Sequence, residues 1–139
     1  MEEILIPQTS GHVGLRIYSP QRDPAGALEY FTVEVSDPTV RATVRVYAHG
    51  VHGLAELFAS MAHEWKGWTG AKEWSSVEEE FGLSCTSDGM GHVRLDIALR
   101  PSLYPEHWRL QASAKTEAGQ LDGLTASARR FVNGERGTA

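Results

Sequence analysis

Alternation of apolar and polar residues is the feature that most constrains how this chain can fold. Val93, Leu95 and Ile97 alternate with charged or small residues, and five other segments alternate in the same way. A period of two is typical of a β-strand with one buried face. The six predicted strands are residues 13–18, 27–35, 40–47, 78–86, 92–100 and 108–115. Turn-forming sequences separate most of them, so we expect antiparallel hairpins, with a bulge or kink near Tyr30.

Two segments have the three- and four-residue spacing of an amphipathic helix. Residues 51–66 place Leu54, Phe58 and Met61 on one stripe, and this stripe predicts that Trp65 belongs to the core. Residues 120–133 form the second predicted helix. A glycine follows each segment, as is common at helix C-termini.

The order of these elements is three strands, a helix, three strands and a helix. This order indicates an α+β fold, which we expect to be one antiparallel sheet of about six strands with both helices packed on one face. The other face of the sheet would be open to solvent. We expect a single domain over residues 1–139, with residues 1–10 and 135–139 loosely ordered.

Composition excludes several classes of protein. The chain has 139 residues, of which 41% are apolar and 22% charged, as in an ordinary soluble domain. A net charge of -5 argues against a general nucleic-acid binder. No apolar run approaches the roughly 18 residues of a membrane helix, and acidic Glu2 and Glu3 stand where a secretory signal would be basic. We therefore expect a cytoplasmic protein that does not bind membranes.

Motifs for catalysis or cofactor binding are missing from the sequence. The G-x-G-x-x-G, P-loop, G-x-S-x-G and H-E-x-x-H patterns do not occur. The single cysteine, Cys85, lies in phase with Phe81 and Leu83, which predicts a buried thiol in place of a catalytic nucleophile. The sequence therefore favours a protein without enzymatic activity and without a cofactor.

Histidines and acidic residues offer only weak site signals. His49 and His52, with His63 or Glu64, have residue types that bind zinc, but their spacing defines no cage, so we predict no bound metal. The acidic run at residues 78–80 has the residue types for acid–base chemistry, and we interpret it as a solvated strand start.

Basic residues gather at positions that strand parity assigns to the open face. These are Arg16, Arg41, Arg45, Arg94, Arg100, Arg109 and Lys115. Fewer acids share these positions, namely Glu34, Glu80 and Asp96. Arginine suits carboxylate and phosphate groups, so such a face could bind an acidic protein or an anionic ligand. The alternative is a set of cross-strand salt bridges that maintain solubility and register.

The tryptophan loop is the second candidate site. Trp68 and Trp74 follow the first helix, and we group them with His92 as a possible aromatic pocket. Indole faces suit a sugar, a base or a cation. The alternative is that these side chains belong to the core and to the end of the helix.

Two short patterns carry a resemblance. The first is W-x-G-W-x-G with one further tryptophan, and the second is D-x-x-G-H-V. They comprise Trp65, Gly67, Trp68, Gly70, Trp74, Asp88, Gly91, His92 and Val93. Over roughly residues 31–132 the chain resembles an actinobacterial family of unknown function, number 6228. The Gly-His-Val element is also similar to bacterial immunity proteins of the WapI type, which neutralise a toxin by binding it. The resemblance implies a binding role and supplies no catalytic residues.

Two classes of function follow. The first is a non-catalytic bacterial protein-binding module, of immunity type, with an acidic protein as partner. The second is a small-molecule-binding protein or small enzyme with its site near Trp68, Trp74 and His92. The sequence favours the first class, because no nucleophile, base and orienting group can be assembled from local spacings.

Overall fold

The computed structural model describes residues 2–48 and 53–134, which form eight strands and two α-helices. The strands are β1 (Glu3–Ile6), β2 (Gly14–Arg22), β3 (Leu28–Ser36), β4 (Arg41–Tyr47), β5 (Lys72–Ser75), β6 (Phe81–Ser87), β7 (His92–Leu99) and β8 (Leu110–Glu117). The helices are α1 (Leu54–His63) and α2 (Leu121–Asn133), and a short 3-10 turn, η1 (Ala118–Gln120), precedes α2.

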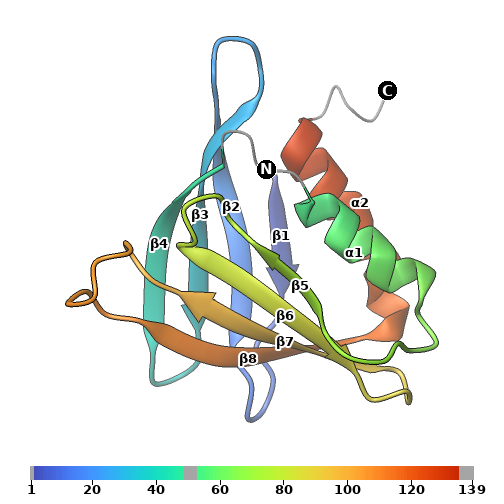
Figure 1. Cartoon of the computed structure of the whole chain (residues 1–139). Helices are drawn as coiled ribbons and strands as arrows, with labels where there is room; N and C mark the ends of the chain where they lie inside the picture. Colours follow the sequence, from blue (N-terminus) through green and yellow to red (C-terminus); the bar gives the residue numbers. More distant parts are fainter. Residues whose placement is uncertain (1, 49–52, 135–139) are drawn as a thin grey trace.

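The predicted single sheet is wrong, although the antiparallel α+β class is confirmed. The strands form two four-stranded antiparallel sheets, β1-β2-β3-β4 (sheet 1) and β5-β6-β7-β8 (sheet 2), as Figure 1 shows. Each sheet is followed by one helix, so the two halves of the chain have the same order of elements. The alternation predicts which side of a strand is buried, but it contains no information on which strands share a sheet.

Two short strands were not predicted from the sequence. Residues 3–6, within the segment that we expected to be loosely ordered, form β1, and Ile4 and Ile6 are buried. Residues 72–75 of the tryptophan loop form β5, which pairs with β6. Four residues contain too few alternations to be recognised as a strand.

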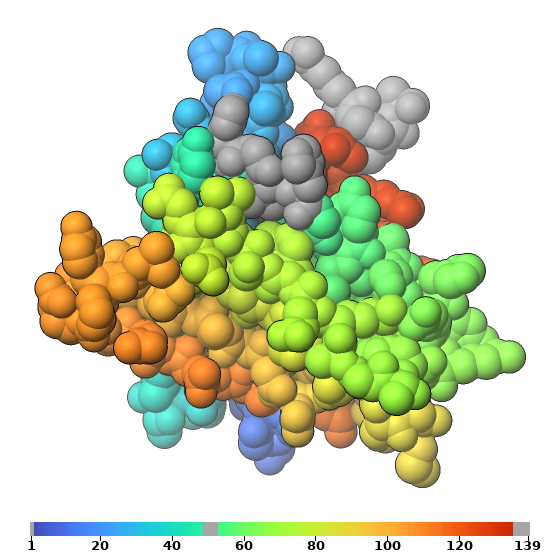
Figure 2. All heavy atoms as spheres, in the orientation of Figure 1, coloured from blue at the N-terminus to red at the C-terminus, as the bar shows by residue number. Residues whose placement is uncertain are grey.

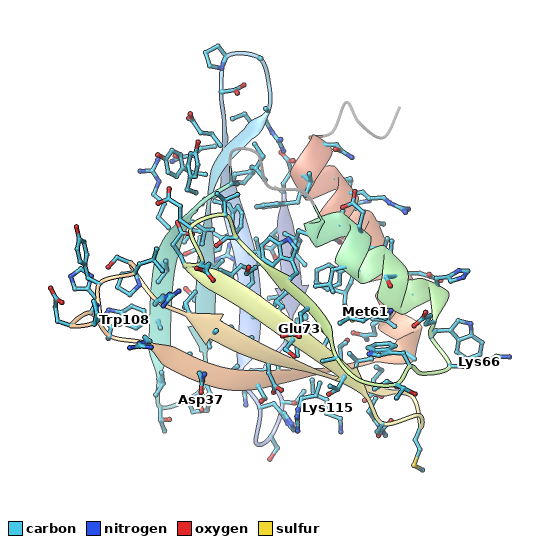
Figure 3. All side chains as sticks on the ribbon, viewed as in Figure 1. Asp37, Met61, Lys66, Glu73, Trp108 and Lys115 are labelled. Atoms are coloured by element: carbon cyan, nitrogen blue, oxygen red, sulfur yellow. The ribbon has the colours of Figure 1, made fainter. Side chains whose placement is uncertain are left out.

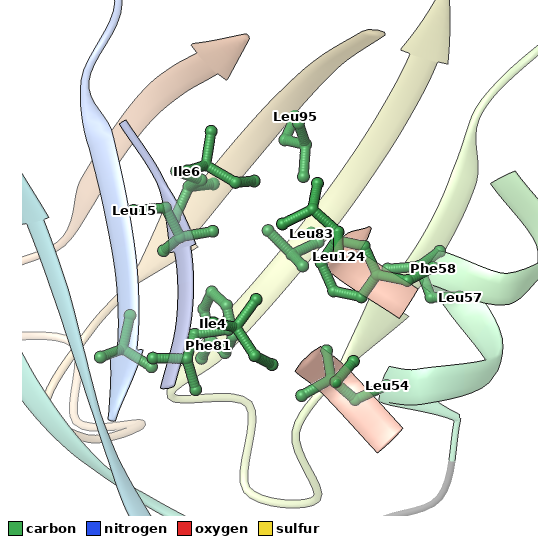
Figure 4. Close-up of a cluster of buried hydrophobic side chains, with 14 of the residues drawn as sticks. Ile4, Ile6, Leu15, Leu54, Leu57, Phe58, Phe81, Leu83, Leu95 and Leu124 are labelled. Carbon is green, nitrogen blue, oxygen red and sulfur yellow. The ribbon is translucent and has the colours of Figure 1, made fainter. Parts of the chain in front are cut away.

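The core lies between the inner faces of the two sheets. Phe31 of sheet 1 packs edge-on against Phe81 of sheet 2 at 6.4 Å and against Phe131 of α2 at 5.8 Å, measured between ring centroids. All three rings are at most 1% exposed. Figure 4 shows apolar side chains from both sheets and both helices meeting in this core. Val44, Val46, Val93 and Leu95 are buried as predicted.

Both helices lie on one side of the molecule, next to the edge strands β1 and β5 (Figure 1). They pack against each other, and α2 also contacts β1 while α1 contacts β5. The predicted stripes are buried, including Leu54, Phe58 and Met61 on α1. The helices therefore close the side of the core between the sheets, and they do not cover a single sheet as predicted.

Helix α1 is shorter than predicted, and Trp65 is not part of the core. The Glu64 N–H donates to the Ser60 carbonyl at the last turn, and the chain then leaves the helical path. Trp65 is 56% exposed because the helical phase that would bury it ends before it. The predicted start at residue 51 lies outside the described residues.

Strand β2 runs four residues further than predicted, to Arg22, into the interval between the predicted strands at residues 13–18 and 27–35. A bulge interrupts its pairing with β3 between Tyr18 and Gln21, opposite Tyr30, and Ser19 has a φ of 53° there. This position agrees with the predicted irregularity near Tyr30. The extension brings Arg22 to the end of α2, where its guanidinium donates to the Phe131 carbonyl at 2.6 Å.

Glu80 joins the two sheets, although the sequence analysis placed it on the open face. Its carboxylate accepts the backbone N–H of Tyr47, at the end of β4, at 3.0 Å. It also accepts the Ser76 hydroxyl at 2.8 Å. Glu80 is only 8% exposed. Within the acidic run, Glu78 and Glu79 are exposed as predicted, while Glu80 is a buried link.

Candidate binding face

The predicted basic residues do not share one face, because they are divided between the two sheets. Arg16, Arg41 and Arg45 belong to sheet 1. Arg94 and Lys115 belong to sheet 2, and Arg100 and Arg109 lie in the β7–β8 connection. Strand parity predicts the outward direction of the residues that lie on strands, but it does not apply to Arg100 and Arg109, and it does not predict the sheet.

Tyrosines and arginines alternate on the outer face of sheet 1, and we name this surface the Tyr/Arg face. It comprises Arg16, Tyr18, Tyr30, Arg45 and Tyr47. Arg16 lies over the ring of Tyr18 at 4.0 Å, and Arg45 lies over the ring of Tyr30 at 3.8 Å. The rings of Tyr30 and Tyr47, directly opposite on β3 and β4, meet edge-on at 5.3 Å. Stacking thus fixes the planes of these side chains.

Hydrogen bonds hold the arginines of sheet 1 in place as well. Arg16 donates to Glu3 at 3.0 Å, and Arg45 donates to Gln21 at 2.6 Å. Arg41 pairs with Glu34 at 2.8 Å. The salt bridges that the solubility interpretation expects are therefore present. Because a guanidinium carries five N–H donors, Arg16 and Arg45 keep further donors that these contacts do not use.

The tyrosines of the Tyr/Arg face were not predicted from the sequence to be part of a site. Tyr18 and Tyr47 occupy the same alternating positions as the arginines, and this was the available signal. The cross-strand register decides the clustering, since it places Tyr18 opposite Thr32, which is in turn opposite Arg45.

The outer face of sheet 2 has a different character. Small residues, Ser75, Gly82 and Ala98, form a row across three strands. With Arg100 and Arg109 they line a hollow of about 600 Å³. No tyrosine or tryptophan lines this hollow, so it lacks a large aromatic side chain that could anchor a protein partner.

The β7–β8 connection carries exposed apolar side chains. It protrudes from the body of the molecule, as Figure 2 shows in orange. Leu103, Tyr104 and Trp108 are 56%, 66% and 47% exposed. Trp108 was predicted to be a buried strand residue, but β8 begins only at Leu110, so the alternation does not apply to it.

One hollow brings together two of the predicted arginines. Arg41 and Arg109 line it with Val40 and Trp108, where the start of β4 approaches the start of β8, and its volume is about 620 Å³. Figure 3 shows Trp108 on this side of the molecule, far from Met61 of α1. Val40 is 47% exposed, so apolar and cationic groups meet at this surface.

The three residues of the predicted aromatic loop have separate environments. The Trp68 indole N–H donates to the Cys85 carbonyl at 3.1 Å. Trp74 packs edge-on against Phe81 at 5.5 Å. His92 Nδ1 lies 2.7 Å from Asp88, which is at the β6–β7 turn. Both tryptophans are half-buried, and their contacts are those of residues that pack at the rim of the core.

Cys85 and Ser102, two described residues that could serve as nucleophiles, are not arranged for catalysis. Cys85 is fully buried, and burial, with a smaller contribution from Asp96, raises the pKa of its thiol to about 12. The predicted buried thiol is confirmed. Ser102 contacts His107 in the exposed β7–β8 connection. No carboxylate in the described part of the chain orients this histidine, so the pair lacks the third member of a triad.

Neither a metal centre nor a membrane span is present in the described residues. No group of three or more histidine, cysteine, aspartate or glutamate side chains within residues 2–48 and 53–134 could hold a metal ion. His49 and His52 lie outside these ranges. No helix in the same ranges is long and apolar enough to cross a membrane.

Small size, two meander sheets and an aromatic, cationic outer face define this protein structurally. The chain belongs to a family of unknown function, DUF6228, which matches residues 6–135. No curated protein and no solved structure matches it. Family membership therefore assigns no activity, and the function has to be inferred from the surface.

Proposed function

We propose that this protein is a non-catalytic protein-binding module and that its Tyr/Arg face binds an acidic surface of another protein. The observation that carries the proposal is that the arginine side chains of this face are held in one conformation. Arg16 and Arg45 are each stacked on a tyrosine and each hydrogen-bonded. Binding such side chains costs little conformational entropy, because their rotamers are already restricted.

Composition of the face supports the proposal. Tyrosine and arginine are enriched among the residues that dominate protein–protein binding energies. Sheet 1 contains four arginines against three glutamates, Glu3, Glu29 and Glu34, in a chain whose net charge is -5. Leu5, on the adjacent strand and 48% exposed, adds apolar area. The combination suits a partner surface with carboxylates around an apolar centre.

The specific form of this proposal is an immunity protein that acts in the cytoplasm. Such a protein neutralises a toxin by covering its surface, so it needs a rigid binding face and no catalytic group. Support comes from the resemblance of the element at Gly91, His92 and Val93 to immunity proteins. This element is on sheet 2, whereas the Tyr/Arg face is on sheet 1. We therefore give the element a role in forming the β6–β7 turn and none in binding.

A second candidate function is small-molecule binding on sheet 2. Trp74 lines a hollow of about 430 Å³ together with small residues such as Ser75 and Gly82. The small residues leave room above this part of sheet 2 for a flat ligand. This candidate predicts that changes on sheet 1 leave binding unaffected.

The test compares three forms of the protein immobilised as bait for a lysate of the source organism. They are the native chain, Arg16→Ala/Arg45→Ala, and the control Lys66→Ala/Arg129→Ala, which also removes two exposed positive charges but lies outside the Tyr/Arg face. A desolvated charge pair at an interface is worth about 2 kcal/mol or more, so the first variant should bind a partner about 30-fold more weakly or worse.

The expected result is a partner retained by the native chain and the control and lost by Arg16→Ala/Arg45→Ala, with all three forms folded by circular dichroism. Equal retention by all three forms would place the site elsewhere and favour sheet 2. Retention of no protein by any form would contradict the binding function itself.

A further inference from the structure

Two four-stranded sheets have four edge strands, and three of these edges are covered. Strand β1 packs against α2, and β5 packs against α1, where the Lys72 ammonium donates to the Ser60 hydroxyl at 2.8 Å. The Ser113 carbonyl of β8 accepts the Val13 N–H at 3.0 Å. Strand β4 is the remaining edge.

The backbone of β4 offers unused hydrogen-bonding groups along this edge. The Tyr47 N–H points away from β3, since it donates to Glu80, and the next N–H, of Ala48, points toward β3 and donates to Glu29. Peptide groups alternate in an antiparallel strand, so those of Thr43 and Arg45 also point away from β3. Neither backbone has a hydrogen-bond partner on that side among the described residues.

Strand β4 lacks most of the features that block edge pairing in other proteins. It is seven residues long and contains no proline. Its register with β3 is continuous from Arg41 to Tyr47, so no bulge twists the edge away. Proline, bulges, short length and charged side chains are the usual ways to prevent another strand from adding to an edge, and of these β4 has only the charges of Arg41 and Arg45.

The charged side chains of β4 itself have one sign. Arg41, which is 72% exposed, and Arg45 alternate with Thr43 on the outer side, and β4 contains no acidic residue. Arg109 lies near the start of the strand, in the hollow that it shares with Val40 and Arg41. Residues directly opposite on paired strands interact, so carboxylates at alternate positions of an added strand would meet these arginines.

We propose that an extended acidic segment of the partner protein adds to sheet 1 as a fifth strand beside β4. Main-chain hydrogen bonds to Thr43 and Arg45 fix the segment, and alternate carboxylates contact Arg41 and Arg45. An apolar side chain beyond the start of β4 lies in the hollow between Val40 and Trp108. This inference rests on the proposed binding function and adds the mode of recognition, which is strand addition.

The test uses peptides selected from a random library of 12-residue sequences on the native protein. We expect the selected peptides to carry acidic residues at alternate positions. Fluorescence anisotropy then measures the affinity of the best labelled peptide for the native chain, Thr43→Pro and Thr43→Ala. Proline removes the outward N–H, which an edge strand tolerates, whereas alanine keeps it. Thr43→Pro should weaken binding about tenfold or more and Thr43→Ala by less than about threefold.

A second measurement covers the case in which Thr43→Pro disturbs the strand. Every second N–H of an added strand faces β4, and the others face away from it. Of two peptides methylated on one or the other set of backbone nitrogens, one should therefore lose binding to the native chain and the other should keep it. Equal effects in both phases, equal binding by both Thr43 variants, or selection of no peptide would each overturn strand addition.

The two proposals fail in different ways. If a partner is lost on Arg16→Ala/Arg45→Ala but is retained by Thr43→Pro at full affinity, the face binds without strand addition, and only the present inference is wrong. If neither Arg16→Ala/Arg45→Ala nor Thr43→Pro affects binding, the proposed function of the Tyr/Arg face is wrong as well.

Discussion

Replacing Glu80 tests how the two sheets are joined at the end of β4. Its buried carboxylate accepts one hydrogen bond from the Tyr47 N–H and one from the Ser76 hydroxyl, at 3.0 and 2.8 Å. Hydrogen bonds to charged groups contribute about 1.5–3 kcal/mol each, so losing two of them in Glu80→Ala should lower the free energy of unfolding by about 3–6 kcal/mol. Glu80→Gln keeps one acceptor oxygen and should lose about half as much.

The assay is urea denaturation followed by far-ultraviolet circular dichroism at constant pH. Glu78→Ala is the matched control, because Glu78 belongs to the same acidic run and is exposed. We expect it to change stability by less than about 0.5 kcal/mol. If Glu80→Ala unfolds at the same urea concentration as Glu78→Ala, the carboxylate does not join the sheets and our account of this contact is wrong.

Three further predictions concern single residues. Cys85 should not react with a thiol reagent until the protein unfolds. The pKa of its thiol is raised from 9.0 to about 12 in the folded state. The free energy of unfolding should therefore be unaffected by this thiol below pH 9 and should fall as the pH rises from 9 to 12, because the thiol of the unfolded chain ionises first. In urea titrations, Cys85→Ala should abolish this fall. Arg22→Ala removes hydrogen bonds to two carbonyls at the end of α2 and should reduce the unfolding free energy by about 2–3 kcal/mol; an unchanged urea midpoint would contradict this role. In hydrogen exchange by NMR, the amides of Thr43 and Arg45 should exchange much faster than that of Val44, and equal protection would show that the β4 edge is covered.

Much of the local structure follows from the sequence, because it depends on neighbouring residues. The alternation of Val93 with Leu95 and Ile97 predicts β7, and the stripe through Leu121 and Phe131 predicts α2. The burial of Cys85 follows from the same alternation. In each case the period of the apolar residues is the cause of the structure.

Arrangements that depend on distant residues could not be predicted in the same way. The division into two sheets depends on β1 and β5, which are too short to show a period. The burial of Glu80 depends on a backbone N–H of Tyr47 that is 33 residues away. The position of Trp65 depends on where α1 ends.

The candidate site was predicted in part. Arg16 and Arg45 were identified as outward-facing, and the structure places both on sheet 1. Tyr18 and Tyr30 were missed as members of the face, since only the register between β2, β3 and β4 brings them beside these arginines. Parity gives the direction of a side chain, and register gives its neighbours.

Hydroxyl-radical footprinting of the free protein and of its complex with the captured partner tests the central claim most directly. Radicals oxidise accessible aromatic side chains, so the measurement reads the Tyr/Arg face and the rest of the surface in one sample. We predict that Tyr18, Tyr30 and Tyr47 are oxidised in the free protein and protected in the complex, while Trp65, 56% exposed and next to α1, is oxidised equally in both. Unchanged oxidation of the three tyrosines in the complex would contradict binding through the Tyr/Arg face.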